Sequence, residues 1–246
     1  MKRYFSLLAI LLITQLGFSQ YTLDKIKEPI YFGIGLGSAG ISKNLLNKYP
    51  NLSDQEIQNF LHVSPKTPFR FDDWAIKQSS YKAKKVSDIL LYSSFIPPLL
   101  LLLDRPNEGE GNTLGTHAVL LAETITVNWG LTNLAKRAAK RPRPYMYNDN
   151  FDIFSIEERR KKNSRMSFFS GHTSMVSAMY FLTAATFANY YPNSRWRPFV
   201  WGASISIPAL TGFLRVKAGK HFPTDVLVGY AVGALIGGVL VPALHQ

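Results

Sequence analysis

The chain has 246 residues, and its apolar residues, 46% of the total, are gathered into long blocks without charges. That distribution is typical of a membrane protein and argues against an ordinary soluble domain. The formal net charge of +12 predicts contact with something anionic, which leaves nucleic acid, acidic lipid headgroups and a phosphorylated substrate open. The absence of cysteine excludes disulfides, thiolate metal ligands and a cysteine nucleophile.

Residues 1–19 have the pattern of an export signal. Two basic residues come first, an apolar run follows at 4–16, and small residues close the segment. The alternative is an uncleaved signal anchor, although this run is shorter than the roughly 20 residues that a membrane span needs. Both interpretations place Gln20 on the outer side of the membrane.

Residues 20–87 form a polar segment, which we predict to be exported. It contains no apolar run long enough to cross a bilayer, and Pro50, Pro65 and Pro68 mark turns. Its end, residues 73–85, mixes aromatic side chains with lysines. That mixture fits a helix lying on the membrane surface or a solvated linker.

Five hydrophobic segments follow within residues 88–246, which we predict to form the functional membrane domain. They are residues 89–103, 113–135, 168–191, 198–214 and 226–244. The predicted fold class is therefore all-α, an integral membrane bundle of about five transmembrane helices, or six if the signal is uncleaved. In the last segment Gly229, Gly233 and Gly237 recur on one helix face, which favours close approach of a neighbouring helix.

Two ionisable side chains, His117 and Glu123, lie within the second segment. Such groups are costly inside a membrane and are often functional. For Glu123 we favour a structural hydrogen bond, since the sequence identifies no partner for it.

Alternation of the five spans places residues 136–167 and 215–225 on the same side as residues 20–87. The first of these loops is rich in lysine and arginine, and the positive-inside rule alone would place it in the cytoplasm. The basic N-terminus and the number of spans favour the opposite orientation. In that orientation the loops face the periplasm and their cations bind phosphate.

Reactive side chains are concentrated in three stretches on that face. They are Lys136 and Arg143, then Ser170, Gly171 and His172, then Arg215, His221 and Asp225. Ser170 and Gly171 begin a predicted helix, where free backbone N–H groups attract an anion. A carboxylate at Asp225 can accept from one ring nitrogen of His221 and leave the other free as a nucleophile. Together these groups can hold a phosphoryl group and attack it.

The spacing Lys136-x6-Arg143-Pro144, Ser-Gly-His and Arg215-x5-His221-x3-Asp225 resembles the three-part signature of the type 2 phosphatidic acid phosphatase superfamily. The resemblance covers roughly the last two-thirds of the chain and leaves residues 20–87 outside. Phe169 stands where the family usually has proline, and Leu214 stands where it usually has serine. The second difference removes a hydroxyl that could bond the phosphate.

This resemblance implies a phosphatase that works through a phosphohistidine. His221 would attack phosphorus, Asp225 would orient it, and His172 would protonate the leaving oxygen. The groups that would hold the phosphoryl oxygens are Lys136, Arg143, Ser170, Gly171 and Arg215. This chemistry requires no metal and no other cofactor. For Arg137, Lys140 and Arg141 the sequence leaves open a supporting contact or a solvated basic face.

The membrane setting predicts a lipid phosphate as the substrate. Phosphatidic acid, phosphatidylglycerophosphate, undecaprenyl pyrophosphate and lipid A all offer a terminal phosphoryl group. The predicted location is a bacterial inner membrane, with several spans and the active site facing the periplasm. An exported nonspecific acid phosphatase, a vanadium-dependent haloperoxidase and a non-enzymatic protein that binds anionic lipid stay open as alternatives. Nucleic-acid binding is not expected, because it would explain the charge but not the histidines or the spans.

Overall fold

The computed structural model describes the bundle and the loops at one of its ends. The described residues are 21–24, 26–47, 50–62, 69–103, 113–149 and 155–245, so the predicted signal at residues 1–19 lies outside them. These residues form helices and loops, with no strand among them. The predicted all-α class is confirmed.

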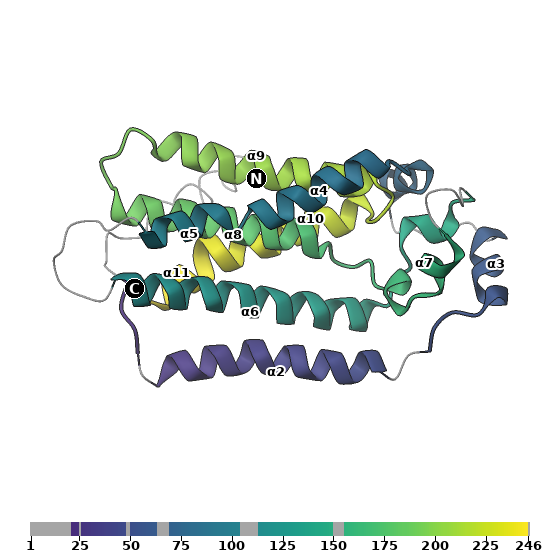
Figure 1. The fold of residues 1–246 in the computed structure, drawn as a ribbon, viewed down its shortest axis with the longest axis horizontal. Coiled ribbons are helices and arrows are strands. Elements are labelled where there is room, and N and C mark those ends of the chain that lie inside the picture. The colour runs from purple at the N-terminus through teal and green to yellow at the C-terminus, as the bar shows by residue number, and fades with distance from the viewer. Residues whose placement is uncertain are drawn as a thin grey trace, which may run out of the picture.

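Long helices lie side by side along one axis, and short helical segments cover one end (Figure 1). The bundle contains α2 (Lys27–Asn47), α4 (Tyr81–Ser93), α5 (Ile96–Leu103), α6 (Thr113–Ala139), α8 (Gly171–Tyr190), α9 (Arg197–Lys217), α10 (Pro223–Leu235) and α11 (Val241–Leu244). A π-helical turn, η4 (Ile236–Leu240), joins the last two. The shorter elements are α3 (Asp54–His62), α7 (Ile156–Arg160) and the 3-10 helices η1 (Arg70–Lys77), η2 (Pro144–Tyr147) and η3 (Lys162–Arg165).

Helix α8 is the central element of the bundle. It contacts α4, α5, α6, α9 and α10, and most of its residues from Thr173 to Thr186 are buried. Many of these residues are serine, threonine or alanine, whose small side chains let the surrounding helices approach. The core beside it contains Leu120, Met179 and Leu182, all fully buried.

Three stretches of the described chain are long and apolar enough to cross a membrane, judged by length and composition. They are Tyr81–Leu103, Arg197–Lys217 and Pro223–Leu244. The first begins eight residues before the predicted segment 89–103, at the start of α4, and it has a break between α4 and α5 near Pro97 and Pro98. The segments predicted at 113–135 and 168–191 form α6 and α8. How many of the five cross a membrane stays a prediction.

Helix α2 differs most from what the sequence predicts, because residues 20–87 were expected to lie outside the bundle. Instead α2 packs along α6 (Figure 1). The contact is close, since a Cβ built on Gly130 would come within 2.7 Å of the carbonyl oxygen of Gly35. Glycine, serine and lysine interrupt the apolar residues of α2, so its sequence contains no long hydrophobic block.

The two ends of α2 lie at opposite ends of the bundle. Near its start, the N–H of Thr22 donates to the carbonyl of His245 at 2.7 Å. Beyond its other end, the N–H of Leu52 donates to the carbonyl of Arg160 at 2.9 Å. Tyr21 and the reactive loops are therefore at opposite ends of the bundle. Any count of membrane spans has to consider α2 as well, which the sequence did not indicate.

The spacing of the glycines in the last segment predicts close approach of a neighbouring helix, and the structure identifies that helix as α8. A Cβ built on Gly229 would come within 2.6 Å of the Ser170 carbonyl oxygen. The same construction on Gly233 would come within 2.1 Å of the Ser174 carbonyl oxygen, and on Gly237 within 2.0 Å of the Ala178 carbonyl oxygen. Only glycine fits these positions without moving α10. Because Gly229 touches Ser170, the same contact fixes the start of α8, where an anion-binding site is predicted.

Candidate active site

The structure brings the predicted reactive residues together at one end of the bundle. At that end α6 and α9 finish, while α8 and α10 begin (Figure 1). Lys136 and Arg215 lie in the last turns of α6 and α9, His172 lies in the first turn of α8, and Asp225 lies in the first turn of α10. Arg143 and His221 come from the two intervening loops.

Hydrogen bonds to both ring nitrogens fix His221, which is 1% exposed. Its Nδ1 lies 2.9 Å from the carbonyl oxygen of Ser167, and a carbonyl can only accept, so Nδ1 carries the hydrogen. Its Nε2 lies 3.2 Å from Nη1 of Arg143, which can only donate. The lone pair of Nε2 therefore faces the predicted phosphate-binding cations, as a nucleophile requires.

The His221 imidazole is held in its neutral form. Burial, together with the positive charges of Arg143, Arg215 and Lys136, holds the pKa of His221 well below its usual value of 6.5. A protonated imidazole has no lone pair at Nε2 and cannot attack phosphorus. A nucleophile at this position would therefore need no separate base to deprotonate it.

Asp225 lies near His221 but does not make the predicted hydrogen bond. Its Oδ2 is 3.7 Å from Nδ1 of His221, too long for such a bond. Instead it accepts from the hydroxyl of Ser167 at 2.5 Å and from the N–H of Phe222 at 2.9 Å. Ser167 thus connects Asp225 with His221, because its hydroxyl donates to the carboxylate and its carbonyl accepts from the imidazole. The sequence could not show this link, because a backbone carbonyl makes the contact.

Neutral acceptors hold Arg143, one of the three cations that we expect to line the phosphate pocket. Arg143 donates from Nε to the carbonyl of Asn163 at 2.9 Å and from Nη1 to the carbonyl of Lys220 at 3.0 Å. Among the described residues, Nε of Arg215 has no hydrogen-bond partner although it is buried. A buried pocket with excess positive charge and unused donors is suited to a dianionic phosphoryl group.

The start of α8 supplies backbone donors to the same pocket. Ser170 is the N-cap of the helix, and its hydroxyl is 2.9 Å from the hydroxyl of Thr173. Gly171 follows, where a Cβ would come within 3.1 Å of Nζ of Lys136. The missing side chain lets the ammonium group lie directly over the helix N-terminus. Both features attract the same anion.

Arg141 connects two fully buried carboxylates. Its Nη1 donates to Oδ1 of Asp225 at 2.7 Å, and its Nη2 donates to Oδ2 of Asp72 at 2.8 Å. Asp72 also accepts from the N–H of Thr224 at 3.0 Å, and the guanidinium lies over the ring of Phe222, 4.0 Å from its centre. Of the two roles that the sequence leaves open, Arg141 therefore has the supporting one. Asp72 belongs to residues 20–87, so that segment contributes to the site.

Asp88, which the sequence does not single out, joins the predicted acid to a phosphate-binding cation. Its Oδ1 is 2.9 Å from Nε2 of His172 and 3.0 Å from Nη1 of Arg215. The carboxylate thereby orients the His172 ring. The only signal in the sequence is an acidic residue at the edge of an apolar segment.

Lys220 and Glu158 form a further ion pair at the edge of the pocket. Burial lowers the pKa of Lys220 to about 8, while Glu158 opposes that shift. Because the carbonyl of Lys220 accepts from Arg143, this pair helps to fix the loop that carries His221.

Comparison with known proteins identifies the family. Residues 117–246, more than half of the chain, match the model of the PAP2 superfamily. The chain belongs to the PAP2 superfamily. The resemblance seen in the spacing of the reactive residues is therefore confirmed. No solved structure matches this PAP2 protein.

Two curated relatives are both named lipid A 1-phosphatase. The PAP2 protein is 35% identical over 111 residues to the lipid A 1-phosphatase of Rhizobium johnstonii, a match that covers 45% of this chain and 41% of the relative. It is 34% identical over 113 residues to the lipid A 1-phosphatase of Rhizobium etli, covering 46% and 44%. The chain thus aligns with less than half the length of each relative.

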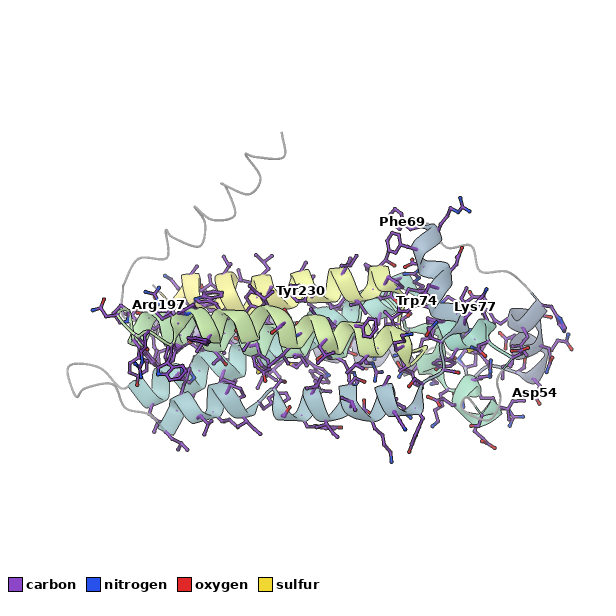
Figure 2. All side chains as sticks on the ribbon, turned by 90° about the horizontal axis from the view of Figure 1, so that it is seen from above. Asp54, Phe69, Trp74, Lys77, Arg197 and Tyr230 are labelled. Carbon is purple, nitrogen blue, oxygen red and sulfur yellow. The ribbon has the colours of Figure 1, made fainter. Side chains whose placement is uncertain are left out.

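An apolar groove of about 580 Å³ opens beside the predicted catalytic residues of this PAP2 protein. Its lining is Phe69, Phe71, Ala139, Arg141, Phe168, Thr224, Leu227 and Val228. Phe69 and Phe71 are stacked 5.4 Å apart and are about half exposed. Figure 2 shows Phe69 projecting outward beside the end of the bundle that carries the site. Arg141 belongs to both the groove and the predicted site, because it lines the groove and donates a hydrogen bond to Asp225.

We expect Asp88→Asn to lower kcat by at least about tenfold with little change in KM, because the amide keeps the shape of the side chain but loses the charge of the carboxylate that orients the His172 ring. Steady-state phosphate release by the purified protein measures both constants. Asp54→Asn, at an exposed position in α3, is the matched control and should leave both unchanged. A rise in kcat/KM for Asp88→Asn would contradict the account, because it would show that the carboxylate competes with the substrate phosphate.

Proposed function

We propose that this PAP2 protein is a membrane lipid phosphatase that hydrolyses a phosphate monoester or pyrophosphate of a lipid through a phosphohistidine at His221. One observation carries the proposal. The buried, neutral ring of His221 directs the lone pair of Nε2 toward a pocket that contains three cations. A pocket of that kind binds a phosphoryl group and places it against the nucleophile.

In the first step Nε2 of His221 attacks phosphorus, and the bond to the leaving oxygen breaks as His172 gives that oxygen a proton. Lys136, Arg143 and Arg215 hold the phosphoryl oxygens together with the N–H of Gly171. Each contact contributes about 3 kcal/mol when charge develops on those oxygens. The N–H at Nδ1 of His221 stays bonded to the Ser167 carbonyl, and the nearby Asp225 stabilises the positive ring.

In the second step water attacks the phosphohistidine. His172, now neutral, accepts a proton from that water, and the bond between phosphorus and Nε2 breaks. Inorganic phosphate leaves, and His221 is again neutral. All groups in both steps belong to the chain, so we propose that the phosphatase reaction needs no metal.

The apolar groove supports a lipid as the substrate. It begins at Arg141 and Phe168, which adjoin the catalytic residues, and its remaining wall is mostly aromatic or aliphatic. A hydrocarbon chain fits such a wall, whereas a soluble sugar phosphate would leave it exposed. Among the four candidate lipids, the similarity to two proteins named lipid A 1-phosphatase supports lipid A.

The first test is phosphate release from phosphatidic acid, phosphatidylglycerophosphate, undecaprenyl pyrophosphate and lipid A in detergent with a metal chelator. We expect release from at least one lipid, and a fall of at least about 10⁴-fold for His221→Ala, because the nucleophile is lost. His62→Ala, at an exposed site in α3, is the control. Folded protein that releases phosphate from none of the four contradicts the proposal. Equal cleavage of a soluble aryl phosphate favours the nonspecific acid phosphatase instead.

We propose a bacterial inner membrane location with the site facing the periplasm. Because α2 connects the two ends of the bundle, this orientation places Tyr21 and His245 at the cytoplasmic end. It therefore reverses the outer placement that the sequence predicts for Gln20, because the start of α2 and the reactive loops lie at opposite ends. It also places the basic loops outside, against the positive-inside rule, which their role in binding phosphate would explain.

The absence of cysteine makes this orientation directly testable. Figure 2 shows Asp54 at the end that carries the site and Arg197 at the other end. In intact spheroplasts an impermeant maleimide should label Asp54→Cys, while Asn193→Cys, next to the start of α9, should react only after lysis. The reverse pattern would place the site in the cytoplasm.

A further inference from the structure

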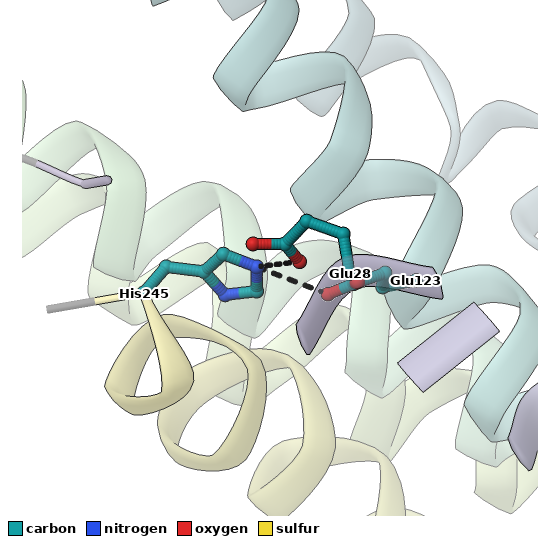
Figure 3. Close-up of side chains that lie close together, drawn as sticks. All are labelled: Glu28, Glu123 and His245. Atoms are coloured by element: carbon teal, nitrogen blue, oxygen red, sulfur yellow. Dashed lines mark hydrogen bonds and ion pairs between the residues drawn. The ribbon is translucent and has the colours of Figure 1, made fainter. Parts of the chain in front are cut away.

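A second cluster of ionisable side chains lies at the end of the bundle opposite the phosphatase site. Figure 3 shows Glu28 of α2, Glu123 of α6 and His245, which follows α11. One ligand atom from each lies within 4.8 Å of the others. Glu123 and His245 are 1% exposed, and the phosphatase mechanism uses none of the three. On α6, Glu123 is about 20 Å from Lys136, at 1.5 Å per residue.

His245 is oriented as a metal-binding histidine would be. Its Nδ1 lies 2.8 Å from the carbonyl oxygen of Val241, which can only accept, so Nδ1 carries a hydrogen. Its Nε2 then points at both carboxylates, 3.0 Å from Oε2 of Glu28 and 3.2 Å from Oε2 of Glu123. Metal-bound histidines usually give their other N–H to a backbone carbonyl or a carboxylate in this way.

Glu123 supplies an independent observation. In the part of the chain that the structure describes, its Oε1 is buried and has no hydrogen-bond partner. A buried carboxylate oxygen without a partner is costly. Without a metal, a proton on Nε2 of His245 bridges the two carboxylates. A divalent cation would displace that proton, and it would then neutralise the −2 charge of two carboxylates and a neutral imidazole.

The distances suit a small divalent ion. With zinc bonds of about 2.0–2.2 Å to nitrogen and oxygen, neighbouring ligand atoms around a tetrahedral ion lie about 3.3–3.6 Å apart. The two distances from Nε2 of His245 are 3.0 and 3.2 Å, so a shift of a few tenths of an ångström in the carboxylates makes room for the ion beside the ring. The two carboxylate oxygens lie within 4.8 Å of each other, so they can bind the same ion after a small adjustment.

We infer that Glu28, Glu123 and His245 bind a divalent metal ion, for which zinc best matches the donor set. The ion fixes α2 and the C-terminal turn to α6. Thr22 also donates its N–H to the carbonyl of His245, so the start of the described chain is held at the same point. This site is independent of the proposed phosphatase reaction.

The test uses the full chain, purified in detergent with an affinity tag that contains no histidine and stripped of metal with a chelator. Titration with Zn²⁺ is followed by calorimetry, and bound metal is counted by mass spectrometry after gel filtration. We expect one zinc ion per chain and a melting temperature that rises with zinc. Glu123→Gln and His245→Gln should weaken binding by at least about 100-fold. His62→Gln, which removes an exposed histidine, should bind as the unchanged protein does.

Two results would overturn the inference. The first is unchanged protein that binds no zinc and melts at the same temperature with zinc and with chelator, which would leave a hydrogen-bonded triad of acids and imidazole. The second is zinc binding that Glu123→Gln and His245→Gln retain. If those variants fail to fold, Glu28→Gln at the edge of the cluster decides between the outcomes, with melting in the absence of zinc as the check of its fold.

Discussion

One buried pocket contains the like charges of Lys136, Arg143 and Arg215. Much of the surrounding structure stabilises these cations there without a bound anion. Backbone carbonyls of two loops accept from Arg143, while Asp88 accepts from Arg215. The buried carboxylates of Asp225 and Asp72 pair with Arg141 instead of entering the pocket. Among the described residues Asp88 is the carboxylate that pairs with one of these three cations, Arg215, so the pocket keeps an excess positive charge for a ligand to neutralise. The same charge keeps His221 unprotonated, so one electrostatic arrangement both binds the phosphoryl group and prepares the nucleophile.

Residues before the first predicted segment take part in this arrangement. Asp72 of η1 bonds Arg141 and the start of α10, and Phe69 and Phe71 form part of the apolar groove. Pro50 accepts from Arg165, and Asp54 pairs with Arg160, so α3 lies on the basic loop that follows α6. The matched family region begins at residue 117, yet part of the wall of the site comes from residues 50–90. Differences between family members in substrate choice can therefore arise outside the shared motifs.

The residues that the sequence singles out by their order and spacing lie together in the structure. Close approach of a neighbouring helix to the face that contains Gly233 was also predictable, because helix periodicity fixes which residues share a face, but the structure was needed to identify that helix as α8. The sequence did not predict the Ser167 carbonyl as the acceptor for His221, since every residue has a carbonyl. It missed Asp88 and Asp72, because single acids far from the motifs give no signal until the fold brings them close. Helix α2 was missed because small and charged residues interrupt its apolar face. The contact of Glu28 with His245 joins residues near the two ends of the chain, a pairing that no local pattern contains.

The most direct measurement of the central claim is the covalent state of His221 during turnover. The protein is mixed with a lipid phosphate that it hydrolyses, quenched within milliseconds in alkali, in which phosphohistidine is stable, and digested for mass spectrometry. The account predicts a phosphoryl group on the imidazole of His221, formed before phosphate release and absent without substrate. Phosphate release with no modification of His221 at any time, or with the phosphoryl group on His172, would contradict it.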